Sequence, residues 1–168
     1  MTSEILIQRA SGADADRLRV IRLAALRDEP DAFGSILSDA EQFGPAQWKL
    51  MASNWNYFLA VHDGRVVGMA GGGRNESLET ARWLYGMFVL PDVRGSGVAA
   101  RLVSEVARWA RQEGVETLGL HVTTSLARAR AFYFRLGFND VGPPEPMDRD
   151  HSLQLQMMIT NLVTNDRI

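Results

Sequence analysis

A glycine-rich segment between a predicted strand and a predicted helix is the feature that most constrains this chain. Residues 82–90, RWLYGMFVL, run apolar as a buried strand does, and Pro91 ends them. Arg94-Gly95-Ser96-Gly97 follows, and Gly97–Glu113 then places apolar side chains at helical spacing. Glycine costs about 1 kcal/mol relative to alanine inside a helix, so glycines at the start of a helix require a physical reason.

A bound anion would supply that reason. The first turn of a helix offers unpaired N–H groups and about half a positive charge, and glycines let a phosphate approach closely. A plain glycine-rich turn without a ligand is the alternative. Gly95-x-Gly97-x-x-Ala100 also has the form of a dinucleotide fingerprint, but four strands precede it and no acidic residue ends the next strand.

Length and composition predict one domain over residues 1–168, since 46% of the residues are apolar. The net charge of -2 and the lack of a basic stretch argue against a nucleic-acid partner. The chain has no cysteine, which excludes disulfides and an acyl-cysteine intermediate and favours a cytoplasmic location. The sequence predicts neither a signal peptide nor a membrane span, and His62 and His151 lack the spacing of metal ligands.

The predicted elements form one mixed sheet with helices, in the order β-α-α-β-β-β-α-β-α-β-β. Asp63-Gly64 between two apolar runs predicts a hairpin, and Ser11 is a predicted helix cap. This order is that of an α/β (α+β) domain. The predicted strands are Glu4–Ala10, the two arms of residues 57–74, Arg82–Leu90, Glu116–Val122, Phe138–Val141 and, after a proline-rich loop, Ser152–Ile159. The predicted helices follow Ser11 and cover Pro45–Met51, Gly97–Glu113 and Ser125–Leu136.

Residues 87–103, MFVLPDVRGSGVAARLV, resemble the acyl-CoA motif of the GNAT N-acetyltransferase family. That motif, (Q/R)-x-x-G-x-(G/A) after a strand and a proline, is matched by Arg94, Gly97 and Ala99. The resemblance implies a central sheet of about six or seven strands, flanked by about four helices and splayed between strands four and five. It also implies acetyl-CoA as cosubstrate. The residues that it places at the cofactor are Met87, Phe88, Val89, Arg94, Gly95, Ser96, Gly97, Val98, Ala99 and Ser125.

Residues 120–138, LHVTTSLARARAFYFRLGF, resemble the strand and helix that follow in this family. Tyr133, Gly137 and Phe138 occupy its fixed positions, whereas Leu126 stands where the family often has asparagine. The resemblance therefore leaves Ser125 as the contact that replaces the asparagine. It implies that Tyr133 is the general acid for the departing thiolate. The alternative is that Tyr133 only packs on the apolar face of its helix.

An amine acceptor arrives protonated near pKa ~10, so its proton needs an acceptor. Some family members carry a carboxylate on the fourth strand, where this chain has Tyr85 and Gly86. Others carry a glutamate on the fifth strand, where this chain has His121. We expect His121 to be the base, with room for its ring beside Gly119 and Thr123 and with a pKa lowered by burial. A hydrogen-bonded core histidine is the alternative.

The sequence thus predicts an acetyl-CoA-dependent N-acetyltransferase that moves an acetyl group directly to an amine of a small molecule or peptide. A catalytically silent acyl-CoA-binding sensor of the same fold is one alternative, and a dinucleotide oxidoreductase built on the Gly95 motif is another. In the family, the acceptor cleft is shaped by segments that correspond to Ala25–Phe43 and Gly142–Ser152. Both are more acidic than basic, which favours a cationic amine. A homodimer is the assembly that the resemblance implies.

Overall fold

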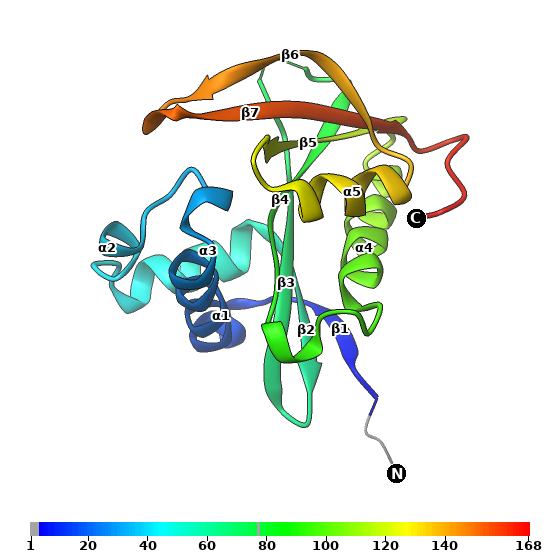
Figure 1. Ribbon diagram of the computed structural model, residues 1–168. Coiled ribbons are helices and arrows are strands. Elements are labelled where there is room, and N and C mark those ends of the chain that lie inside the picture. Colours follow the sequence, from blue (N-terminus) through cyan, green and yellow to red (C-terminus); the bar gives the residue numbers. More distant parts are fainter. Residues whose placement is uncertain (1–3, 77) are drawn as a thin grey trace.

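The computed structural model describes residues 4–76 and 78–168, and over these residues seven strands form one sheet (Figure 1). Their order is β1-β2-β3-β4-β5-β7-β6. The neighbours β4 and β5 run parallel, and the other neighbouring pairs are antiparallel. The sheet confirms the predicted mixed architecture. The strands are β1 Leu6–Arg9, β2 Asn56–His62, β3 Arg65–Gly73, β4 Ala81–Val89, β5 Thr117–Thr123, β6 Asn139–Met147 and β7 Asp150–Asn161.

Helices cover both faces of the sheet, with α1, α2 and α3 on one side and α4 and α5 on the other (Figure 1). The short α2 was not predicted, because a single turn is too short to display helical periodicity. The other four helices lie where the sequence predicts them, and α3 continues three residues past Met51. The helices are α1 Ala15–Asp28, α2 Leu37–Ala40, α3 Pro45–Asn54, α4 Val98–Gln112 and α5 Ala127–Arg135.

Local signals in the sequence set several of these boundaries. Asp63 and Gly64 both have positive φ, 49° and 78°, as the predicted two-residue hairpin turn between β2 and β3 requires. Ser11 and Asp14 form a reciprocal capping box ahead of α1. The two faces of the sheet then bury separate apolar clusters, one centred on α4 and β5 and the other on α1, α3 and β2.

The proline-rich segment after Val141 is part of a strand, so the prediction of a loop there was wrong. β6 continues through Pro143, Pro144 and Pro146 to Met147, with an irregular register opposite β7 between Val141 and Glu145. β6 is the edge of the sheet and pairs only with β7. An edge strand tolerates proline because one of its sides has no neighbouring strand to receive a hydrogen bond.

The sheet opens between β4 and β5, as the resemblance implies. Within the described residues the two strands pair at three positions, the last being Trp83 with Gly119, and then diverge. β4 is also bulged: its register with β3 shifts between Tyr85 and Phe88, and Gly86 there has a φ of 60°. Residues of β4 after Trp83 therefore have strand β3 on one side and no strand on the other. We call this gap the β4–β5 opening.

Candidate active site

A cavity of about 670 Å³ lies beside the β4–β5 opening, and we call it the β4–α5 cavity. The end of β4, the loop before α4 and the helix α5 line it. Of the residues predicted at a cofactor, those that line it are Met87, Phe88, Val89, Arg94, Gly95, Gly97, Ala99 and Ser125. The lining residues that sequence reasoning missed are Glu29, Val93, Ala100, Leu126, Ala127, Arg128, Ala129, Phe132, Arg135 and Leu136.

The glycines at the start of α4 adopt a left-handed backbone conformation and leave open space beside their Cα atoms. Gly95 and Gly97 have φ of 82° and 86°, in the left-handed region that other residues avoid, and a Cβ on either would meet nothing within 4 Å. Gly97 is the N-cap of α4, and no side chain caps this helix. The first turn of α4 therefore keeps uncapped N–H groups beside open space, which suits a phosphate.

Two of the predicted cofactor residues do not line the cavity. Ser96 is exposed, and its hydroxyl donates to the carbonyl oxygen of Val93 at 2.6 Å, so it tightens the loop. Val98 is buried in the core cluster with a side chain 2% exposed. The side chains of Ser96 and Val98 thus shape the loop. The main-chain N–H of Ser96 also donates to the carbonyl oxygen of Val93, at 3.4 Å, which leaves the main-chain N–H of Val98 to contact a ligand.

Arg94, the first fixed residue of the motif, is held within the protein. Its Nε donates to the carbonyl oxygen of Val89 at 3.0 Å. Its Nη2 lies 2.7 Å from a carboxylate oxygen of Asp28 and 3.2 Å from one of Glu29. The guanidinium also sits over the ring of Phe88. Arg94 therefore joins the end of β4 to the end of α1 and fixes one wall of the cavity, and its charge is already neutralised.

Tyr133 projects from α5 into the same cavity and is also packed. Its ring meets Phe132 and Phe138 edge-on, at centroid distances of 5.1 and 5.8 Å. Burial raises the pKa of the phenol, and the charge of Glu29 raises this pKa further. Among the described residues, no hydrogen-bond partner of the Tyr133 hydroxyl is found. The side chain thus presents a neutral O–H group to the cavity.

His121 lies on the other face of β5. Leu118 and Leu120 of this strand enter the core beneath α4, whereas His121 is exposed and its ring stacks on Trp83, with centroids 4.9 Å apart. His121 is therefore not a core histidine, and it does not line the β4–α5 cavity. Partial burial lowers its pKa, and the charge of Glu145 opposes this shift. The imidazole is accordingly neutral at neutral pH.

The room expected beside His121 is taken. A Cβ on Gly119 would lie 2.9 Å from the ring of Trp83, so the indole fills that space and supports the imidazole. Thr123 is buried, and its hydroxyl donates to the carbonyl oxygen of Asp31 at 2.6 Å. Gly119 is therefore small because the indole of Trp83 packs against it. The prediction that Gly119 leaves room for the imidazole was wrong. Thr123 ties the loop after α1 to the end of β5.

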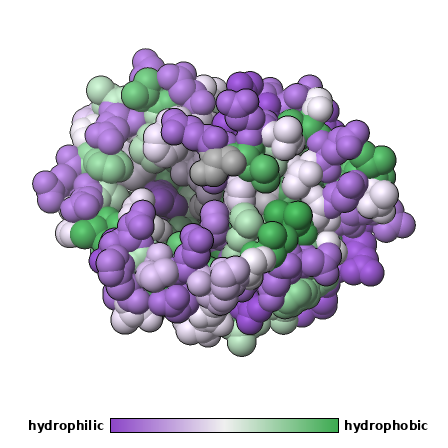
Figure 2. Space-filling model, turned by 90° about the horizontal axis from the view of Figure 1, so that it is seen from above, coloured by the Kyte–Doolittle hydropathy of each residue, from purple (hydrophilic) through white to green (hydrophobic). Residues whose placement is uncertain are grey.

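Seen from the end where β6 and β7 lie, the molecule has a hollow on the side of helices α1–α3, with hydrophilic side chains around it (Figure 2).

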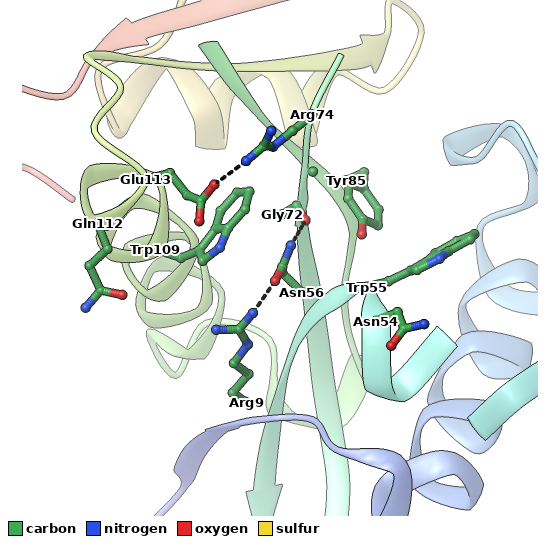
Figure 3. Close-up of a pocket in the computed structure, with 11 residues that line it drawn as sticks. Arg9, Asn54, Trp55, Asn56, Gly72, Arg74, Tyr85, Trp109, Gln112 and Glu113 are labelled. Atoms are coloured by element: carbon green, nitrogen blue, oxygen red, sulfur yellow. Dashed lines mark hydrogen bonds and ion pairs between the residues drawn. The ribbon is translucent and has the colours of Figure 1, made fainter. Parts of the chain in front are cut away.

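A second cavity, of about 580 Å³, lies between α3, α4 and the strands β2 and β3 (Figure 3). Its polar groups bond to one another: Arg74 pairs with Glu113 at 3.0 Å, and Asn56 accepts from Arg9 and donates to the Gly72 carbonyl. Sequence reasoning did not find this cavity.

Known proteins are similar to this chain in sequence and in fold. The model of the Acetyltransferase (GNAT) family matches residues 22–138. The chain belongs to this family. Among curated GNAT relatives, the aminoalkylphosphonate N-acetyltransferase of Salmonella typhimurium is 33% identical over 92 residues, which are 53% of this chain and 60% of that protein. The aminoglycoside N(6')-acetyltransferase type 1 of the same species is 26% identical, over 80% of this chain and 91% of its own length.

Solved GNAT structures share the fold over nearly the whole chain. The ribosomal-protein-alanine N-acetyltransferase of Brucella melitensis gives a TM-score of 0.74 at 24% identity, covering 93% of this chain and 99% of that one. The yncA protein of Salmonella typhimurium, solved with acetyl-CoA, gives 0.74 at 19% identity, covering 95% of each chain. Over the described residues of the present chain, none of the helices has the length and apolarity needed to cross a membrane.

Proposed function

We propose that this protein is an acetyl-CoA-dependent N-acetyltransferase that transfers the acetyl group directly to an amine. The observation that carries the proposal is one cavity that combines the unpaired side of β4, two left-handed glycines at the start of α4, and the phenol of Tyr133. The curated relatives named above, which are called an aminoalkylphosphonate and an aminoglycoside N-acetyltransferase, support an amine acceptor.

The residues present fit the cofactor. Among the described residues, main-chain groups of Met87–Val89 on the side of the β4–β5 opening have no strand partner, so they can pair with the amides of the pantetheine arm. The carbonyl oxygen of Val89 is the exception, because it accepts from Arg94. The N–H groups from Gly95 to Ala99, apart from that of Ser96, which donates to Val93, suit the pyrophosphate. Bound there, acetyl-CoA supplies a thioester whose carbonyl carbon the amine attacks. A strand N–H at the opening is a fixed donor to the carbonyl oxygen, where negative charge develops.

Two side chains of this protein transfer the protons in the reaction. As the new C–N bond forms and the C–S bond breaks, Tyr133 donates its phenolic proton to the departing thiolate. His121 accepts the proton that the amine loses, through water, from the other face of β5. Direct transfer needs no acyl-cysteine, and none can form because the sequence has no cysteine.

Ligand binding separates this proposal from a dinucleotide enzyme. Acetyl-CoA at about 100 times its Kd is expected to stabilise the fold by about 2.7 kcal/mol, which raises the melting temperature of a domain of this size by about 5–10 °C. NAD at the same concentration is expected to leave the melting temperature unchanged. The measurement is a thermal melt with each ligand. Thiol release from acetyl-CoA with a panel of amines then separates an enzyme from a silent acyl-CoA-binding module, which would bind the cofactor and release no thiol.

The role of His121 predicts a specific pH dependence. Since burial lowers its pKa below the ordinary 6.5, the imidazole is neutral above that pKa and kcat/KM falls as the pH drops through it. His121→Ala is expected to lose at least about tenfold in kcat/KM at its optimum and to lose this acid-side inflection. His62→Ala, at the far end of the β2–β3 hairpin, is the matched control. An inflection that persists in His121→Ala would assign the proton to another group.

We further propose a cationic acceptor, a cytoplasmic location and a homodimeric assembly. The acidic segments Ala25–Phe43 and Gly142–Ser152 favour an acceptor whose amine arrives as a cation. The absence of cysteine suits the reducing cytoplasm. A homodimer follows from the family resemblance, and sedimentation of the purified protein tests it.

A further inference from the structure

Arg22 is a half-buried cation beside the β4–β5 opening. It projects from α1, and its guanidinium lies over the ring of Phe33 at 5.0 Å from the centroid. Its Nη2 donates to the hydroxyl of Ser35 at 3.2 Å. Its Nη1 lies 3.6 Å from the position that a Cβ on Gly86 would occupy. The charge is thus held against the bulge of β4, on the face of the sheet opposite the β4–α5 cavity.

This charge has no anionic partner among the described residues. In the described parts of the chain, no carboxylate lies within 4.0 Å of Arg22, so it has no ion-pair partner. Three other arginines of limited exposure each have a carboxylate at 2.7 to 3.3 Å, namely Arg82, Arg94 and Arg130. Arg22 is partly withdrawn from water, and an anion would stabilise a guanidinium in such a place, so the exception at Arg22 suits a bound anion.

The polar neighbours of Arg22 do not meet that need. The rings of Tyr57 and Tyr85 meet edge-on next to it, and its charge acts on both phenols. Burial nevertheless raises the pKa of both tyrosines, so both stay neutral. The hydroxyl of Ser35 is neutral as well. An oxyanion is the group that matches a guanidinium fork in charge and in geometry.

The position of Arg22 indicates that the acceptor molecule itself would carry the oxyanion. Gly86 and Met87 form the bulge where β4 turns away from β5, and Met87 also lines the β4–α5 cavity. A group bound by Arg22 therefore lies next to the strand that separates it from the proposed thioester. A molecule that reached both places would carry an oxyanion as well as the amine that reacts.

We propose that the acceptor is a small amine that also carries a carboxylate or phosphonate group, and that Arg22 binds this oxyanion. The inference rests on the proposed N-acetyltransferase function and names its substrate class. It agrees with an amine that arrives as a cation, because such an acceptor is a zwitterion. It excludes simple amines and polyamines as the preferred substrates, since neither offers an anion to Arg22.

The test is thiol release from acetyl-CoA with amines matched in length. Glycine, β-alanine, 4-aminobutyrate and 2-aminoethylphosphonate carry the oxyanion, and ethylamine, propylamine, butylamine and 1,3-diaminopropane do not. Among the four amines with an oxyanion, we take the one with the highest kcat/KM and compare it with the amine of matched length that lacks the oxyanion. We expect its kcat/KM to be higher by about tenfold to a hundredfold, the usual worth of a hydrogen bond to a charged group. Equal values, or a preference for the amines without an oxyanion, would overturn the inference.

Arg22→Gln is expected to erase this preference, and Arg22→Lys to retain part of it. Arg19→Gln, on an exposed position of the same helix, is the matched control and should keep the wild-type ratio. An arginine that only holds Phe33 and Ser35 in place would lower kcat/KM for all amines alike, and the ratio between matched amines would not change. Retention of the wild-type ratio in folded Arg22→Gln therefore contradicts the inference.

A measurement on the wild-type protein covers the case in which the variants do not fold. Propionate and ethylphosphonate, which lack the amine, should compete with the acceptor and not with acetyl-CoA. Failure of both to compete would count against Arg22 as an oxyanion site. Thiol release that occurs only with amines lacking the oxyanion contradicts this inference alone. Absence of thiol release from every amine while acetyl-CoA still binds contradicts the proposed function, and this inference with it.

Discussion

Gly97→Glu is expected to abolish acetyl-CoA binding in a protein that still folds. The space beside the Gly97 Cα is open, so the new side chain would occupy the place where the pyrophosphate must lie. Its carboxylate would also stand at the first turn of α4 and take the uncapped N–H groups for itself. Loss of two charge-assisted hydrogen bonds amounts to about 3 kcal/mol, or roughly a hundredfold in Kd, before charge repulsion is added.

Two matched variants separate this effect from backbone strain. A residue with a Cβ at a φ of 86° costs about 1–2 kcal/mol of stability wherever it stands. Gly114 follows the other end of α4, has a φ of 77° and is equally open, so Gly114→Glu carries the same strain away from the cavity. Gly97→Ala carries the strain without the charge.

The measurement is titration of each variant with acetyl-CoA by calorimetry, with the melting temperature as the check on folding. We expect wild-type affinity in Gly114→Glu, a modest loss in Gly97→Ala and no measurable binding in Gly97→Glu. Wild-type affinity in a folded Gly97→Glu protein would mean that the start of α4 holds no phosphate.

The parts of the fold that the sequence predicted are those set by local chemistry. The turn at Asp63-Gly64, the cap at Ser11 and the glycines that start α4 each depend on a few neighbouring residues, and the structure has them where they were predicted. The proline-rich segment of β6 was misjudged because proline is read as a loop former. Its place at the edge of the sheet, which permits proline, is a property of the whole topology.

The candidate site divides in the same way. Residues within the two motif segments were placed at the cavity from the sequence, including Gly97 and Tyr133. Glu29 was not, because it reaches the cavity from the end of α1, more than fifty residues before the motif along the chain. Arg22 lies on the other face of the sheet, against the bulge of β4, and was not predicted either. No pattern in the sequence predicts that an arginine on a helix will have no carboxylate as an ion-pair partner. Only the packing of α1 against β4 shows this.

Tyr133→Phe is expected to keep the affinity for acetyl-CoA and to lower turnover by about 10²–10⁴-fold, the usual worth of a general acid. The ring packs between Phe132 and Phe138, and the substitution keeps that packing because it removes only the hydroxyl. The hydroxyl has no partner within the described residues, so its removal should cost little stability. Binding and catalysis are thereby separated in one variant.

Burial of Tyr133 affects this proton transfer in two ways. A raised pKa makes the phenol a weaker acid, and each unit adds about 1.4 kcal/mol to the transfer. A thiolate that leaves into the same apolar surroundings would have its own pKa raised as well, which would cancel much of that difference. The raised pKa also keeps the phenol protonated past its ordinary value of 10, so Tyr133 itself should cause no loss of kcat up to pH 10.

The measurement for Tyr133→Phe is single-turnover acetyl transfer, which isolates chemistry from product release, together with the Kd for acetyl-CoA. A large loss in the transfer rate at unchanged Kd assigns the proton donor. The wild-type transfer rate in Tyr133→Phe would leave Tyr133 as a packing residue, and the thiolate would then take its proton from water. A loss of affinity equal to the loss of rate would instead place the hydroxyl in cofactor binding, because a donor used only as the C–S bond breaks does not hold the ground state.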